Sequence, residues 1–184
     1  MKELAAYVSS KLRKEGIRAV LSGGACVSIY SENRYQSYDL DFVENVPAAK
    51  KHLKDVLSQI GFVESGRYFR HSDTPFFLDF IAGPLSVGNE PIFETSEIAL
   101  PTGILVLLSP TDCVKDRLAA YYHWGDTQCL EQAVLVIKNA RVNLRDVRRW
   151  SVAEGKLSEF ERIRKRLLAA SHRKEQKPAG HRTK

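Results

Sequence analysis

The chain has 184 residues, of which 43% are hydrophobic and 27% charged, a composition that excludes a disordered or fibrous protein and is sufficient for one buried core. No stretch approaches the roughly 20 consecutive apolar residues that span a bilayer, and residues 1–18 have a charged amphipathic pattern, so we expect a cytoplasmic protein with no signal peptide and no membrane contact. The net charge of +6 is uneven, because residues 141–184 hold 14 Lys and Arg against 5 Asp and Glu, a surplus of 9 that leaves residues 1–140 with 6 − 9 = −3.

The first half of the chain alternates helical and strand patterns. Apolar residues at helical spacing predict a helix over residues 2–15, and the short β-branched run 17–21 before Ser22-Gly23-Gly24 predicts a buried strand ending in a tight turn. We then expect a short helix over 25–30, a strand over 39–43 with period-two alternation, a helix from Pro47 to the stop at Gly61, a hairpin of 62–64 with 68–70, a strand over 76–81, a loop over 84–96 and a hairpin of 97–100 with 104–108.

From Ser109 onward the pattern is helical. Ser109 or Thr111 can cap a helix that runs through Tyr122, and Asp126 can cap one that runs through Lys138. Two further helices are expected over 143–153 and 157–170. The predicted fold is therefore α/β (α+β), with a mixed sheet and flanking helices in residues 1–108, a helical C-terminal bundle in 109–170, and a flexible basic tail in 171–184.

Three carboxylates carry the chemistry that we predict. Asp39 and Asp41 lie at i and i+2 of one strand, so both project to the same face while Leu40 faces the core. Asp79 lies in a second strand and would be costly to bury without a metal or a basic partner. Transfer of phosphoryl or nucleotidyl groups uses two divalent metals held by carboxylate oxygens, and the sequence thus predicts a Mg²⁺ or Mn²⁺ site built from these three acids.

The turn Ser22-Gly23-Gly24 follows a strand and opens a helix, so its backbone N–H groups can approach a phosphate with no side chain in the way. Taken alone, a Gly-Gly turn is most often a tight connection. The glycine turn and the acids in this order and spacing are more specific than either alone.

The segment LSGGACVSIYSENRYQSYDLDFV resembles the Gly-Gly and Asp-x-Asp signature of the DNA polymerase beta-like nucleotidyltransferase superfamily, and FFLDFIA is similar to the strand that carries its third acid. Arg34, Ser37 and the segment LSPTDCVKDRLAAYYHWGDTQCLEQA most resemble the small bacterial nucleotidyltransferases of abortive-infection and toxin-antitoxin systems. The resemblance covers residues 17–81 best. Ala25 departs from the pattern, because many members have a phosphate-contacting serine there.

The resemblance implies a role for each of these residues. Gly23 and Gly24, together with Ser22, would bind the phosphates of a nucleoside triphosphate, Asp39 and Asp41 would hold both metals, and Asp79 would complete the site and help to activate the acceptor hydroxyl. It also implies that Lys115 and Asp126 contribute to the nucleotide site. The plain alternatives are a charged helix face for Lys115, Asp116 and Arg117, and an N-cap for Asp126.

Other residue groups have simpler explanations. Cys26, Cys113 and Cys129 are odd in number and have no CxxC spacing, so we expect buried thiols and neither disulfides nor zinc. His123 and Trp124 are expected to seal a core between helices. The basic C-terminal region favours a polyanion such as RNA (tRNA) as partner, although a solvated helix face gives the same charge.

We therefore predict a metal-dependent transfer of NMP from an NTP to a hydroxyl acceptor, such as the 3′ end of an RNA, and the resemblance raises the question of a cognate antitoxin. Two alternatives stay open at this point. One is a small-molecule acceptor of the aminoglycoside type. The other is a non-catalytic nucleic-acid-binding module on the same fold, whose binding would be salt-sensitive and independent of metal.

Overall fold

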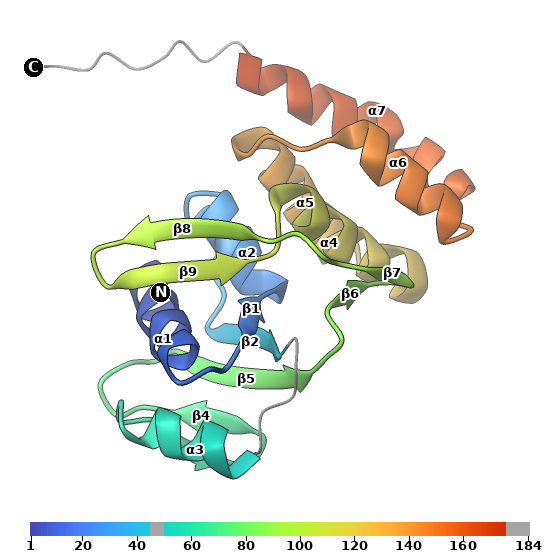
Figure 1. Ribbon diagram of the computed structural model, residues 1–184. Helices are drawn as coiled ribbons and strands as arrows, with labels where there is room; N and C mark the ends of the chain where they lie inside the picture. Colours follow the sequence, from blue (N-terminus) through green and yellow to red (C-terminus); the bar gives the residue numbers. More distant parts are fainter. Residues whose placement is uncertain (45–49, 176–184) are drawn as a thin grey trace, which may run out of the picture.

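A seven-stranded mixed β-sheet and seven helices make up the fold of the computed structural model, which describes residues 1–44 and 50–175, with side chains described as far as residue 171 (Figure 1). The strands lie in the order β3-β4-β5-β2-β1-β9-β8. β1 pairs in parallel with β9 and β2 in parallel with β5, while all other pairs are antiparallel. Their bounds are β1 Ala19–Leu21, β2 Asp39–Glu44, β3 Val63–Ser65, β4 Tyr68–Arg70, β5 Phe77–Ala82, β8 Ser96–Leu100 and β9 Gly103–Leu107.

Three helices accompany the sheet, namely α1 Lys2–Lys14, α2 Gly23–Tyr30 and α3 Lys50–Ser58. The amphipathic pattern explains α1, whose residues Ala5, Val8 and Leu12 are fully buried at helical spacing. α2 begins two residues before the predicted Ala25, because the glycines themselves form its first turn. The predicted start of the third helix at Pro47 lies outside the described residues.

Four helices, α4 Pro110–Trp124, α5 Thr127–Asn139, α6 Leu144–Ala153 and α7 Leu157–Glu175, gather beside the sheet (Figure 1). Side-chain caps explain where α4 and α6 begin. The hydroxyl of Ser109 accepts a hydrogen bond from the Asp112 N–H at 3.1 Å, and Asn143 caps α6 in the same way. α4 ends at Gly125, which has φ +66°. The predicted mixed sheet with flanking helices and a helical C-terminal region is confirmed.

Three expectations are wrong in detail. Residues 84–96 are not simply a loop, because Ser86–Val87 (β6) pairs with Glu90–Pro91 (β7). α7 continues to Glu175, five residues beyond the predicted helix end at residue 170. His123 and Trp124 do not seal a core, since both are exposed and Trp124 is 79% accessible.

The two halves share one continuous hydrophobic cluster, which extends from Leu12 in α1 to Leu167 in α7. α2 is the structural link, because it contacts β2 on one side and α4 and α5 on the other. The predicted boundary after residue 108 falls between β9 and α4, and a division into domains there stays a prediction. Cys26, Cys113 and Cys129 are buried free thiols, as predicted. None of the described helices has the length and apolarity needed to cross a membrane.

Candidate active site

The structure brings Asp39, Asp41 and Asp79 to one face of the sheet. β2 and β5 run parallel, and their register places Asp41 directly opposite Asp79. Asp39 precedes Asp41 by two residues on β2, so all three side chains share a face. Leu40 and Leu78 point to the other face and are fully buried in the core. The apolar residues of the two strands thus fix the orientation of the acids.

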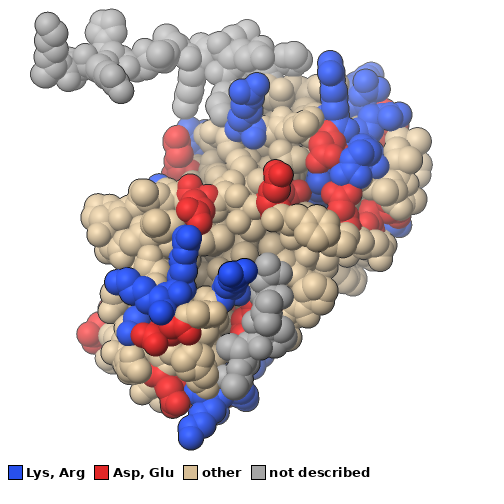
Figure 2. All heavy atoms as spheres, in the orientation of Figure 1, with Lys and Arg blue, Asp and Glu red and all other residues tan. Residues whose placement is uncertain are grey.

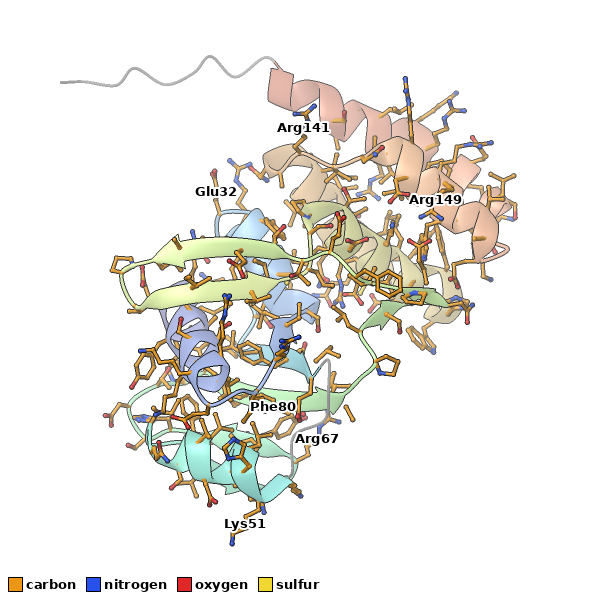
Figure 3. The ribbon with its side chains drawn as sticks, viewed as in Figure 1. Glu32, Lys51, Arg67, Phe80, Arg141 and Arg149 are labelled. Atoms are coloured by element: carbon orange, nitrogen blue, oxygen red, sulfur yellow. The ribbon has the colours of Figure 1, made fainter. Side chains whose placement is uncertain are left out.

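A partner that the sequence did not reveal holds Asp79, which is only 4% accessible. Arg67, in the turn between β3 and β4, forms an ion pair with the Oδ2 atom of Asp79, and its own side chain is 69% exposed (Figure 3). The contact follows from the pairing of β4 with β5, which puts Tyr68 opposite Asp79. The only sequence signal was a cation next to Gly66 in the predicted hairpin turn.

Asp41 is the acid whose pKa the site perturbs. Burial raises the pKa of Asp41 to about 6, and the negative charges of Asp39 and Asp79 add to this rise, while Arg117 opposes it. The Asp41 carboxyl therefore ionises at a higher pH than an ordinary aspartate, and added positive charge would favour its ionised form. Such mutual repulsion is the electrostatic condition that a cation or a cationic group would relieve.

Gly23 lies against Asp41. Its φ is +63°, and a Cβ atom at this position would fall on the Oδ2 atom of the Asp41 carboxylate. At Gly24, a Cβ atom would lie 3.0 Å from the Ser37 hydroxyl. The close approach of the turn to the acid strand therefore favours glycine strongly at position 23, whereas a side chain at position 24 would require only a small shift of Ser37. The two glycines also place the N-terminus of α2, which has no side-chain cap, beside the carboxylates.

Serine hydroxyls fix the relative position of the turn and the acid strand. The N–H of Ser22 donates to the backbone carbonyl of Asp41 at 2.8 Å, and the Ser22 hydroxyl reaches the same carbonyl at 3.3 Å. Ser37 donates to the Asp39 carboxylate, and the N–H of Ser37 donates to the hydroxyl of Ser28 in α2 at 2.9 Å. Ser22 is thus engaged with the backbone here, and its predicted contact with phosphate stays a prediction.

The structure does not bring Lys115 into contact with the three acids. Its side chain is 2% accessible, and its ammonium lies 2.9 Å from Glu90, 3.1 Å from Asp112 and 2.7 Å from Asp146. Burial alone would lower the pKa of Lys115, but these three carboxylates outweigh it and raise the pKa. The position favours a structural role that joins α4 to α6 and β7, and the predicted role in nucleotide binding gains no support from it.

Arg117 is the cation of α4 whose charge acts on the acids. Residues two apart on a helix do not face the same side, so Lys115 and Arg117 cannot both point to β2. Arg117 contacts Asp116 and Gln132, and it counters the raised pKa of Asp41. The resemblance implied a nucleotide-site role for Lys115, with Arg117 only a member of the same charged cluster, and the helical phase separates the two residues.

Asp126 caps α5. Its Oδ1 atom accepts from the N–H groups of Gln128 at 2.9 Å and Cys129 at 3.2 Å. Its pKa is lowered, first by the hydrogen bond from the Cys129 thiol and then by the backbone N–H groups, with a further contribution from Arg117. Asp126 therefore acts as the N-cap of α5, and any additional contact with a nucleotide stays a prediction.

The donor chemistry at the three acids fits a divalent cation, because hard cations prefer carboxylate oxygens and the repulsion at Asp41 favours added positive charge. The three acids do not yet stand in the arrangement of a complete set of metal ligands. Within residues 1–44 and 50–175, no three His, Cys, Asp or Glu side chains already stand at the spacing of metal ligands. Asp79 already forms an ion pair with Arg67, and the Asp39 carboxylate already accepts a hydrogen bond from the Ser37 hydroxyl. A cation that used all three acids would have to displace Arg67.

Comparison with known proteins identifies solved structures with a similar fold. No protein-family model and no curated protein matches the chain. Among solved structures, it is similar to an antigenic nucleotidyltransferase-like protein from Paracoccidioides brasiliensis, with a TM-score of 0.65 and 14% identity over 94% of this chain and 92% of that one. It is also similar to the antibiotic-resistance factor ANT(2'')-Ia, with a TM-score of 0.51 and 15% identity over 93% and 95% of the two chains. At these identities the likeness shows a shared fold along nearly the whole length.

Proposed function

We propose that the protein is a metal-dependent nucleotidyltransferase that transfers NMP from an NTP to a hydroxyl acceptor. The observation that carries the proposal is the placement of Asp41 opposite Asp79 and against Gly23, which puts three carboxylates and a helix N-terminus within one small site. The fold shared with a nucleotidyltransferase-like protein supports the proposal.

Each group of the site has a part in the proposed reaction. Asp39 and Asp41 would hold Mg²⁺ or Mn²⁺, which neutralises the triphosphate and activates the acceptor hydroxyl. The N–H groups of Gly23 and Gly24 would bind phosphate oxygens at the start of α2. Arg117 would add positive charge from α4. Asp79, once released by Arg67, would accept a hydrogen bond from the acceptor hydroxyl and orient it.

The test is incubation of the purified protein with each labelled NTP, Mg²⁺ or Mn²⁺, and separate acceptors. We expect transfer that disappears in Asp41→Asn and persists in Asp55→Asn, an exposed acid of α3 that serves as the matched control. Failure of transfer to every acceptor, together with salt-sensitive RNA binding that does not change in Asp39→Asn, would instead support the non-catalytic module.

Two acceptor classes belong in that screen. A small acceptor of the aminoglycoside type is included because ANT(2'')-Ia, which shares the fold, is an antibiotic-resistance factor. An RNA 3′ end such as that of tRNA is included because of the basic residues 141–184. Part of this charge is already neutralised, since Arg149 pairs with Glu90 and Asp146, and Arg166 with Glu131.

The narrower resemblance to abortive-infection and toxin-type enzymes is part of the proposal. Its test is induced expression in a bacterial host. We expect growth arrest with the wild-type chain and normal growth with Asp41→Asn at equal expression. Rescue by a neighbouring gene product would identify a cognate antitoxin, and normal growth with both chains would remove the toxin assignment without affecting the enzymatic one.

A further inference from the structure

A groove between α6 and α7 has an unusual combination of surfaces. Two adjoining hollows of about 650 and 230 Å³ both include Leu144, Arg145 and Leu168 in their walls, so they form one continuous groove. We call it the arginine groove, and its other main wall residues are Arg141, Arg148, Arg164 and Leu167. It has an aliphatic floor and cationic walls on both sides. None of these residues belongs to the candidate active site.

The charge of the arginine groove is not neutralised by the described chain. Arg148 and Arg164 share a single carboxylate, that of Glu161, at 3.1 and 3.2 Å. Within the described residues, Arg141 and Arg145 form no ion pair, although both are exposed. Four arginines against one glutamate leave a surplus of 4 − 1 = 3 positive charges. Elsewhere on α6 and α7, Arg149 pairs with Glu90 and Asp146, and Arg166 pairs with Glu131. Figure 2 shows blue and red side chains mixed on the visible face at the end of the molecule where these helices lie in Figure 1.

The floor is apolar and reachable. Leu168 is 38% accessible, and Leu144, which lines the same groove, is half-buried. Arg141 lies at this end of the groove, next to the last part of α7 (Figure 3). Leucine side chains with Arg145 and Arg148 on the α6 side and Arg164 on the α7 side match the apolar face of an amphipathic helix whose flanks carry carboxylates.

We propose that the arginine groove binds an acidic amphipathic helix of a partner protein. The chain's own C-terminal segment does not have this chemistry, because residues 172–184 hold five Lys and Arg against one Glu. A single-stranded nucleic acid fits less well, since such strands stack their bases on exposed aromatic rings. The one aromatic residue among those that line the groove is Phe160, which is 3% accessible.

The spacing of the arginines supports a helical occupant. Arg145 and Arg148 lie three residues apart on α6 and therefore project from the same side of that helix, while Arg164 stands on the opposite wall in α7. A helix laid between them would present glutamates on both flanks to these two walls. Its leucines, at positions i, i+3 and i+7, would contact Leu144 and Leu168.

The test uses the full chain and a fluorescein-labelled 20-residue helical peptide with leucine at i, i+3, i+4 and i+7 and glutamate on the flanks. The control peptides are a scrambled sequence of equal charge and a version with lysine in place of glutamate. The variants are Arg145→Glu in the wall and Leu168→Ser in the floor. Arg162→Glu is the matched control, because Arg162 is exposed on α7 and does not line the groove.

We expect fluorescence polarisation to show saturable binding of the acidic helix. Reversing the charge of Arg145 should weaken it by about tenfold or more, which corresponds to about 1.4 kcal/mol, and Arg162→Glu should change it by less than about twofold. The scrambled and lysine peptides should bind at least about tenfold more weakly, because they lack the apolar face or the carboxylates. Nucleotidyl transfer to a small-molecule acceptor should be unaffected by Arg145→Glu, because Arg145 lines the groove and is not part of the candidate active site, so the two proposals can fail independently.

Four outcomes would overturn the proposal. Equal binding of the scrambled peptide would show a non-specific charge effect, and no binding up to about 1 mM would show that the groove does not accept such a helix. A single-stranded RNA that binds more tightly than the peptide and is lost in Arg145→Glu would assign the surface to nucleic acid. A dimer that dissociates in Arg145→Glu would place a second copy of the chain in the groove.

Discussion

Replacing Asp41 with asparagine should make the protein more stable, because Asp41 is ionised at neutral pH at a position that disfavours its charge. Its pKa rises from 3.8 to about 6 on folding, through burial and the charges of Asp39 and Asp79. Between these pH values the folded state binds more protons than the unfolded state, so the stability that this group contributes falls as the pH rises. A shift of about 2 units corresponds to an upper limit of about 3 kcal/mol at pH 8.

The assay is urea unfolding of wild-type protein and Asp41→Asn at pH 4 and pH 8, without divalent metal. The advantage of the variant should be small at pH 4, where the wild-type carboxyl is largely protonated, and should approach about 1–3 kcal/mol at pH 8. Asp55→Asn, on the exposed side of α3, should show no such pH-dependent gain. A variant that is no more stable than wild type at pH 8, or an advantage equal at both pH values, would refute the electrostatic account of the site.

Three further substitutions test separate contacts. Gly23→Ala should cost about 1–3 kcal/mol more in unfolding free energy than Gly16→Ala, because both have positive φ but only the Cβ atom at Gly23 collides with a side chain; equal losses would remove the packing argument. Arg67→Ala should tighten Mn²⁺ binding several-fold in a calorimetric titration, since it frees Asp79 for a hard cation; unchanged or weaker binding would show that Arg67 does not compete. Lys115→Met should lower the unfolding free energy by about 3 kcal/mol, because three carboxylates lose their cation; a loss below about 0.5 kcal/mol would contradict the structural role.

The acid strands could be predicted because their signals are local and strong. Asp39 and Asp41 stand in a period-two pattern with buried Leu40, so their shared face follows from strand geometry alone. Asp79 was predicted to lie on a neighbouring strand from the apolar run that surrounds it and from the resemblance, and the structure supplies the register. The helix caps Ser109 and Asp126 were equally readable, since a cap depends on only a few adjacent residues.

The features that the sequence did not reveal depend on contacts between distant segments. β6 and β7 have two residues each, which is too short for an alternating apolar pattern to be recognised. Both strands contact the C-terminal helices: the Val87 carbonyl accepts a hydrogen bond from the Trp150 indole at 3.1 Å, and Glu90 forms an ion pair with Lys115. Arg67 reaches Asp79 only through the pairing of β4 with β5. The two residues of each pair lie far enough apart in the sequence that no local pattern indicates their contact.

Helix geometry also separates Lys115, which the resemblance placed in the nucleotide site, from its neighbour Arg117. On α4, Lys115 and Arg117 are about 200° apart around the helix axis, so one must face away from the acid strand. Lys115 faces α6 and β7, and there its charge is matched by three carboxylates that would otherwise repel one another. Arg117 is left as the cation of α4 whose field reaches Asp41. If the site binds a triphosphate, Arg117→Met should therefore weaken nucleotide binding without the large loss of stability expected for Lys115→Met, and the opposite pattern in equilibrium binding and urea unfolding would exchange the two assignments.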